Sequence, residues 1–252
     1  MKRPLLLIIG LIISCTVQSQ TLNLIRLSAD LLAQSKQNYP PNEMLQSLAN
    51  CSEQLLIQQL SGDTEKNIFW INLYNATVQI ALRENAEGLK KHKRFFRQPR
   101  VLVAGKMLSL NDIQHGILRH SRRPWGGGRY KKWFPSHFEK TQRVVHPDFR
   151  IHFLLNNGST ESPQILVLQP ERAERLFQLS IHPYLSEHVN CDTSRNKIII
   201  PAFFKWYRAD FGGEQGIYKL LRTEQIIKPD CFPTLVYRPF NWKPQPGKFW
   251  ED

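Results

Sequence analysis

The feature that most constrains this fold is the stretch from Asn67 to Arg83, which is apolar nearly all round when it is drawn as an α-helix. A helix of this kind must be buried, so the rest of the chain is expected to pack around it. Asn72, Asn75 and Gln79 nevertheless recur at helical spacing and share one face. A buried amide without a partner costs about 1–3 kcal/mol. Two roles stay open for this stripe: internal capping of a neighbouring loop, or lining a functional site.

The remaining patterns predict a single α+β domain that is rich in helices and built around a small, mostly antiparallel sheet. Ser109 and Asp112 have the spacing of a capping box at the start of one helix, and Pro183 is expected to break or bend another. We expect helices within residues 20–66, 109–119, 170–188, 203–211 and 214–227, strands at 101–103, 148–157 and 234–237, a hairpin turn at 105–106 after the first of these strands, a hairpin over 189–200, and loops at 88–100 and 121–147.

The N-terminus has the pattern of an export signal. Two basic residues precede an almost unbroken apolar run over residues 5–13, which is shorter than the roughly 20 residues that span a bilayer. This pattern is typical of a secretory signal peptide. Cleavage before Gln20 is one expectation. The other is lipidation of Cys15, because residues 12–15 resemble a bacterial lipobox. The protein is therefore expected to be exported from a bacterial cytoplasm, and to be periplasmic, anchored to the outer membrane, or secreted.

The charge of the chain restricts its partners. A formal net charge of +13 favours anionic partners such as nucleic acid, lipid headgroups or acidic envelope polymers. Export disfavours nucleic acid, so we expect an anionic envelope polymer or lipid headgroups, with membrane attachment only through a lipid at Cys15. The sequence does not indicate an oligomeric state.

Three cysteines, Cys51, Cys191 and Cys231, follow the expected signal. In an oxidising compartment an odd count permits one bridge and one free thiol, and Cys191–Cys231 is the pair we favour for a bridge. The alternative is that all three are small buried hydrophobic residues. No spacing resembles a metal-binding or redox motif.

Four polar residues are candidates for chemistry. His115 and Arg119 are four apart on an expected helix and share a face. Arg150 and His152 alternate with apolar residues on an expected strand, so they should project on the same side. A histidine in such a pair can act as an acid–base, and an arginine can neutralise a carboxylate or phosphate.

Four stretches together resemble one family. They read FWINLYNA (residues 69–76), SLNDIQHGILR (109–119), RIHFLLNNGS (150–159) and FKWYRADFG (204–212), and the tail YRPFNW (237–242) is a weaker fifth. Their order and content are similar to the domain-of-unknown-function family 547, over about residues 60–245. Together with the expected signal at 1–19, this divides the chain into an N-terminal helical segment at 20–60, the family-like domain at 61–245 and a tail at 246–252. The resemblance implies no particular reaction.

This sequence departs from the family pattern at two positions. The third stretch of the family usually continues through two cysteines, and Asn157 and Ser162 stand at those positions here. The joint change is what we expect if the two cysteines partner each other structurally in relatives. A thiol nucleophile is absent from both positions, although Ser162 stays a candidate nucleophile if His115 or His152 reaches it. No Gly-x-Ser-x-Gly turn surrounds it.

These residues lead to two hypotheses of function. In the first, one polar pocket performs hydrolysis or acyl transfer on an envelope polymer. In the second, the protein is a non-catalytic binding module of the envelope, a pseudoenzyme without the cysteines of its relatives. We expect no cofactor, and no metal, because His115, His152 and Asp210 lack the short spacings of metal ligands. The candidate pocket comprises catalytic His115, His152 and Ser162, and substrate-binding Asn72, Asn75, Arg119, Arg150 and Asn156.

Overall fold

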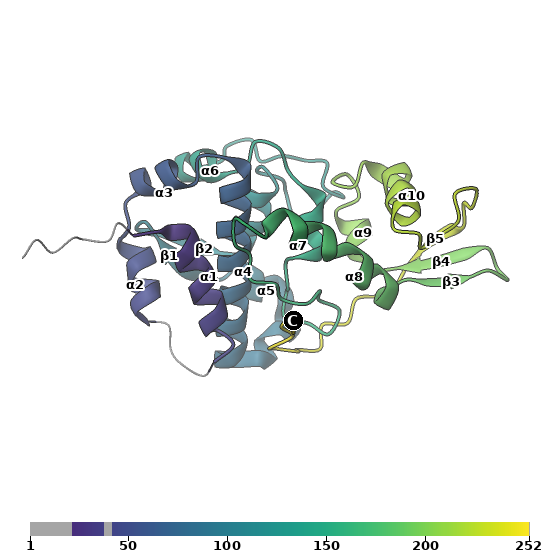
Figure 1. Cartoon of the computed structure of the whole chain (residues 1–252), viewed down its shortest axis with the longest axis horizontal. Helices are drawn as coiled ribbons and strands as arrows, with labels where there is room; N and C mark the ends of the chain where they lie inside the picture. The colour runs from purple at the N-terminus through teal and green to yellow at the C-terminus, as the bar shows by residue number, and fades with distance from the viewer. Residues whose placement is uncertain (1–21, 38–41, 252) are drawn as a thin grey trace, which may run out of the picture.

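The computed structural model describes residues 22–37 and 42–251. The expected export signal and Cys15 lie outside the described residues. The molecule is elongated, with the N-terminal helices at one end and a small sheet at the other (Figure 1). The N-terminal helices are α1 (Leu24–Gln34), α2 (Asn42–Asn50) and α3 (Glu53–Gln59).

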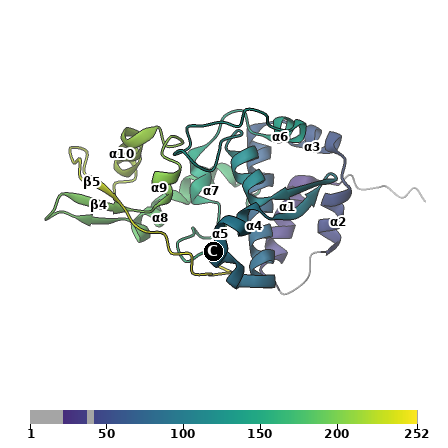
Figure 2. The same cartoon turned by 180° about the vertical axis from the view of Figure 1, so that it is seen from behind.

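The apolar stretch forms the centre of the fold, as predicted. It belongs to α4 (Asp63–Asn85), in which nearly every residue from Lys66 to Leu82 is buried. The helix begins where the Glu65 carboxylate accepts a hydrogen bond from the Gly62 amide. Helix α1 packs along α4, and a first apolar cluster forms between them and the segments that follow (Figures 1 and 2).

The basic segment at residues 88–100 is helical as far as Arg97 and then enters a strand, so the prediction of a loop was wrong. It forms a 3-10 helix, η1 (Ala86–Lys91), and then α5 (His92–Arg97). The physical reason is apolar burial: Leu89, Phe95 and Phe96 pack into the first cluster while the basic side chains face outward. The hairpin that follows was predicted correctly, with β1 (Pro99–Val103) antiparallel to β2 (Lys106–Ser109).

The helix predicted from residue 109 is present, and its capping box is formed. The Ser109 amide and hydroxyl both donate to the Asp112 carboxylate, and the Asp112 amide donates back to the Ser109 hydroxyl. Its main part is a π-helix, η2 (Asp112–Leu118), which places one extra residue in each turn. The loop region after it includes a short helix, α6 (His137–Gln142).

Residues 148–157 are not the predicted strand. They contain a 3-10 helix, η3 (Phe149–Phe153), because the Asp148 carboxylate accepts from both the backbone and the side chain of Arg150 and closes a local turn. This turn separates Arg150 and His152, which we expected on the same side. The side chain of Arg150 pairs with Asp148 and Glu174, whereas His152 faces Asp210.

The C-terminal half builds a second apolar cluster. The helix expected at 170–188 is divided at Ser180, and Pro183 lies in the first turn of the second part, where proline is tolerated. The helix predicted at 203–211 ends earlier, at Trp206. The elements are α7 (Ala173–Leu179), α8 (Ile181–His188), β3 (Asn190–Asp192), β4 (Lys197–Ile200), α9 (Phe203–Trp206), α10 (Gly213–Thr223) and β5 (Thr234–Tyr237).

The α+β class is confirmed, with one difference in the sheet. Two small sheets are present: β1–β2, and β3–β4–β5, in which β4 pairs antiparallel with β3 and parallel with β5. After β5 the chain returns to the middle of the molecule, beside α5 (Figure 2). Cys51, Cys191 and Cys231 are free thiols, so the favoured bridge is not formed in the structure. Within residues 22–37 and 42–251, no helix is long and apolar enough to cross a bilayer.

Candidate active site

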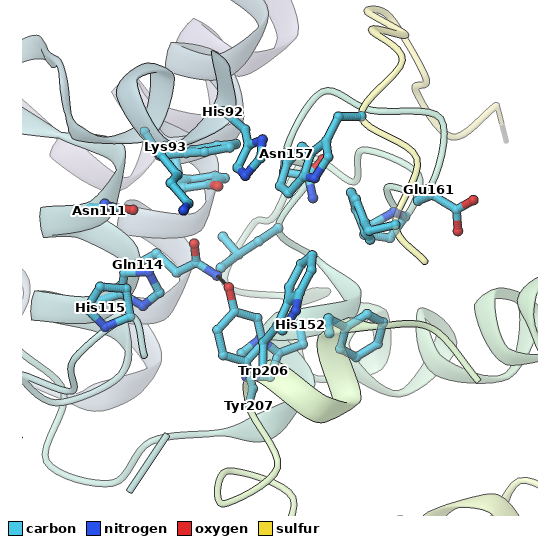
Figure 3. A pocket seen from close by; sticks show the side chains of 18 of the residues that line it. His92, Lys93, Asn111, Gln114, His115, His152, Asn157, Glu161, Trp206 and Tyr207 are labelled. Atoms are coloured by element: carbon cyan, nitrogen blue, oxygen red, sulfur yellow. Dashed lines mark hydrogen bonds between the residues drawn. The ribbon is translucent and has the colours of Figure 1, made fainter. Parts of the chain in front are cut away.

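A cavity of about 510 Å³ lies where the two apolar clusters meet. Tyr74 and Phe96 approach it from the first cluster, and Tyr184 and Phe203 from the second. Side chains from α5, η2, η3, α9 and the C-terminal tail converge on the same space (Figure 3). The polar residues at its wall are His92, Lys93, Arg97, Asn111, Gln114, His115, His152, Asn157 and Glu161.

A buried ion pair lies beside this cavity. The guanidinium of Arg119 donates to both carboxylate oxygens of Asp210, with Nε–Oδ2 at 2.5 Å and Nη2–Oδ1 at 3.1 Å. Arg119 is only 1% exposed, and its guanidinium lies 4.4 Å from the centre of the Tyr207 ring. A bidentate pair satisfies both groups, which a buried charge requires.

The ion pair fixes the proton of His115. Arg119 Nη1 lies 2.8 Å from His115 Nδ1. A guanidinium can only donate, so His115 Nδ1 must accept, and a neutral ring then carries its proton on Nε2. Burial lowers the pKa of His115 well below its ordinary value, and the positive charge of Arg119 lowers it further. His115 is therefore a neutral ring that offers an N–H donor.

The same ion pair also fixes the tautomer of His152, which donates to the carboxylate of Asp210 where His115 accepts from Arg119. His152 Nε2 lies 2.9 Å from Asp210 Oδ2, and an ionised carboxylate can only accept. The proton is thus on Nε2, and Nδ1 keeps a lone pair. Burial lowers the pKa of His152, although the hydrogen bond to Asp210 opposes that shift. The ring is stacked on Tyr207, with centroids 4.2 Å apart and planes at 5°, which fixes its orientation.

Asp210 stays ionised in this environment. Burial alone would raise its pKa, but hydrogen bonds from His152 and Arg119 outweigh burial and hold the pKa well below its usual range. Arg119, Asp210, His115 and His152 form a buried array, and Tyr207 joins it to the cavity wall. The Tyr207 hydroxyl accepts a hydrogen bond of 3.2 Å from Gln114 Nε2 there (Figure 3).

A glycine loop covers the ion pair. Gly128 has φ +82°, and a Cβ there would lie 2.7 Å from Asp210 Oδ1 and 2.8 Å from Arg119 Nη2. Arg122 donates to the Gly128 carbonyl and lies near the same carboxylate. The carbonyl of Gly127 accepts from the Ala209 amide at 2.8 Å. Only glycine lets the backbone approach the ion pair this closely.

Aromatic rings and cations line other parts of the cavity. The His92 and Trp242 rings are stacked, with centroids 4.2 Å apart and planes at 3°, and Trp206 lies nearly parallel to Trp242 at 5.9 Å. The exposed cations Lys93 and Arg97 come from α5. This combination suits a ligand that carries a negative charge and also has a sugar ring or acyl chain to pack on the aromatic side chains.

A family model described as a protein of unknown function, DUF547, matches residues 57–185. This chain belongs to DUF547. The resemblance seen in the motifs is thereby confirmed, and the matched region includes the first three stretches with His115, Arg119 and His152. Comparison with curated proteins and with solved structures found no match.

The structure brings together only part of the pocket that we predicted from the sequence of this DUF547 protein. His115 and His152 line the cavity, and Arg119 lies beside it. Arg150 is engaged elsewhere, in ion pairs with Asp148 and Glu174 and against the Phe177 ring.

The three asparagines cap loops instead of lining the cavity. Asn72 makes a pair of hydrogen bonds with the backbone of Leu168. Asn75 accepts from the Asn156 amide and donates to the Leu154 carbonyl, each at 2.9 Å. Asn156 donates to the Pro163 carbonyl and accepts from the Gly158 amide. Of the two roles left open for the amide stripe, internal capping is the one that these contacts match.

Asn157 and Ser162, which stand at the cysteine positions of the DUF547 pattern, are hydrogen-bonded to each other. Ser162 Oγ donates to Asn157 Oδ1 at 2.7 Å. The two positions are adjacent in space, as expected of mutually partnered cysteines in relatives. Asn157 lines the cavity, whereas Ser162 is fully buried next to Ser159 and is not among the lining residues.

Two central residues of the array were missed from the sequence. Asp210 was considered only as a metal ligand, and Tyr207 was not considered. Both lie in the stretch at 204–212, where a single acid stands among four aromatic residues. An acid in so apolar a stretch needs a buried partner, and that signal could have paired Asp210 with Arg119 or His152.

Proposed function

We propose that this protein is an exported hydrolase of the cell envelope that cleaves an acyl ester or amide bond in an anionic envelope polymer. One observation carries the proposal: Arg119 and Asp210 fix the tautomers of two neutral histidines beside one cavity. The free ring nitrogen is a hydrogen-bond donor in His115 and an acceptor in His152. His152 Nδ1 offers a lone pair, and His115 Nε2 offers an N–H. A general base and an electrophilic donor are what hydrolysis of a carbonyl compound requires.

Water is the nucleophile in this proposal. Among the described residues that line the cavity, none is serine, threonine or cysteine. Water attacks the carbonyl carbon while His152 Nδ1 takes its proton, and His115 Nε2–H donates to the oxyanion. The tetrahedral intermediate then breaks its bond to the leaving oxygen or nitrogen, which receives the proton from His152. The products are a carboxylic acid and an alcohol or amine, and His152 is neutral again.

The wall of the cavity supports an anionic polymer as substrate. Lys93 and Arg97 can hold a carboxylate or phosphate, and the rings of Trp206 and Trp242 can pack on sugar or acyl groups. The net charge of +13 favours such a polymer, and the N-terminal signal pattern supports export to the envelope, where the protein would meet one.

The test is release of acid from O-acylated envelope glycan and from p-nitrophenyl esters, measured with purified protein at several pH values. His152→Ala should lower kcat/KM by about 100-fold or more, the usual contribution of a general base. His137→Ala is the matched control, since this histidine is exposed on α6 and outside the cavity. The rate should rise with pH and level off near neutrality, because the lowered pKa leaves His152 neutral there.

Two results would contradict the proposal. Equal rates for His152→Ala and the native protein would remove His152 as the base. Tight binding of the polymer without acid release, unchanged in His152→Ala, would favour the alternative, a non-catalytic binding module. The absence of the cysteines of the family pattern at Asn157 and Ser162 is the observation that favours this alternative.

A further inference from the structure

Four aromatic side chains form an exposed patch on the loop between η2 and α6. This aromatic patch consists of Trp125, Tyr130, Trp133 and Phe134. The last two are the most exposed, at 82% for Trp133 and 93% for Phe134. Within the described residues neither ring stacks on another ring. Large apolar side chains that gather exposed on one loop of a folded protein indicate an interaction site.

The loop that carries the aromatic patch is held in shape. The Arg123 amide donates to the Tyr130 carbonyl at 2.8 Å, and the Lys132 amide donates to the Ser121 carbonyl at 2.7 Å. The rings of Trp125 and Tyr130 contact each other, with centroids 5.4 Å apart. These contacts fix the base of the loop before any partner arrives, which lowers the entropy lost on binding.

The patch is surrounded by positive charge. Residues 121–135 contain five lysines and arginines and no acid. Arg122 lies near Asp210, and Lys132 pairs with Glu139. Arg129 and Lys131 are exposed, and no acidic side chain in residues 22–37 or 42–251 pairs with either. Their charge is therefore free to contact an anionic partner.

We infer that the aromatic patch is a peripheral binding surface for a membrane that contains anionic phospholipid. Trp133 and Phe134 enter the headgroup region, and Arg129 and Lys131 contact lipid phosphates. Insertion of aromatic rings next to basic residues is the usual chemistry of interfacial binding. The inference goes beyond hydrolysis and does not depend on it.

Phe134 distinguishes lipid from a hydrated polymer as the partner. Its side chain has no polar group, and a soluble polyanion offers no apolar phase that would take it out of water. A lipid interface does, and it suits the amphipathic indole of Trp133 as well. Trp125 belongs to the patch and also lines the cavity, so membrane binding would bring the cavity close to lipid-attached material.

The test is co-sedimentation of the full chain with vesicles of phosphatidylcholine alone and with one quarter phosphatidylglycerol. Trp133→Ala/Phe134→Ala should lower the partition coefficient for the anionic vesicles by about tenfold or more, and Arg129→Gln/Lys131→Gln should remove most of the preference for anionic lipid. The controls are Phe232→Ala and Lys219→Gln/Lys228→Gln, which change exposed residues outside the loop at 121–135. The apolar N-terminal run is present in every variant and contributes equally to each.

Brominated lipid supplies a readout that depends on position. Fluorescence quenching should fall in Trp133→Phe, which keeps an aromatic ring at that position but removes the most exposed tryptophan of the patch. Partition equal to the native protein in the Trp133→Ala/Phe134→Ala variant would overturn the inference. So would binding to an anionic polysaccharide but not to vesicles, which would identify the patch as a polymer site.

Discussion

At the scale of single residues, substitutions at two neighbouring glycines distinguish the effect of backbone strain from the effect of a clash with the site. Gly127 and Gly128 both have positive φ, at +63° and +82°, but only a Cβ on Gly128 would meet Asp210 and Arg119. A Cβ at positive φ costs about 1–2 kcal/mol, and overpacking adds about 1–3 kcal/mol. We expect Gly128→Ala to lower the free energy of unfolding by more than Gly127→Ala, measured by urea titration.

Gly128→Ala should also lower hydrolytic activity, because displacing Asp210 removes the acceptor that holds the proton of His152 on Nε2. Gly127→Ala is the matched control, since the nearest atom to its Cβ would be the Lys205 carbonyl oxygen at 3.8 Å. Equal stability and equal activity in the two variants would mean that the ion pair tolerates the added methyl group, and that the loop does not position it.

At the scale of elements, Asn75 ties α4 to the segment that follows His152. Its amide pairs with the Leu154 carbonyl and the Asn156 amide, and Asn75→Ala would leave both unpaired in the interior. We expect a loss of about 1–3 kcal/mol in the free energy of unfolding, measured by urea titration. KM should stay unchanged, because Asn75 does not line the cavity.

Asn72→Ala is the matched control, because it removes a similar pair of hydrogen bonds at Leu168. Both variants should lose stability by similar amounts, whereas a lower kcat is expected only for Asn75→Ala, through displacement of the segment with His152. An Asn75→Ala protein of native stability with a raised KM would instead give the amide a role in substrate binding.

The elements that sequence patterns predicted well are those whose signals are local. The apolar helix at 67–83, the hairpins at 101–109 and 189–200 and the capping box at Ser109 follow from periodicity and turn chemistry within a few residues. The predicted strand at 148–157 failed because one side chain, Asp148, closes a turn that hydrophobic alternation does not register. The predicted loop at 88–100 was wrong because the many basic residues indicated a solvated segment, whereas three apolar residues among them are buried.

The site was predicted in part for the same reason. His115 and Arg119 meet because helical spacing places them on one face, and the structure joins them at 2.8 Å. Asp210 stands 91 residues beyond Arg119, so their contact depends on how the two apolar clusters pack. No local pattern contains that information, so the position of Asp210 between Arg119 and His152 could not be predicted from residue spacing alone.

At the scale of the whole molecule, the buried array links stability to pH. Burial lowers the pKa of both His115 and His152 in the folded state, while in the unfolded chain each titrates near 6.5. The unfolded state therefore binds more protons as the pH falls below about 6.5, and stability is lost in that direction. Asp210, whose pKa is also lowered, adds a second loss only below about pH 4.

His115→Gln should therefore flatten the dependence of stability on pH. Between pH 7.5 and 5.5 a histidine that stays neutral when folded accounts for about 1 kcal/mol of lost stability. The native protein should show this loss in urea titrations at the two pH values, and His115→Gln should show about 1 kcal/mol less of it. His137→Ala, at an exposed ring, should leave the loss unchanged. A pH dependence identical in His115→Gln and native protein would mean that His115 takes up a proton in the folded state as readily as in the unfolded chain. Arg119 would then face a second cation, and the assignment of His115 as a neutral donor would fail.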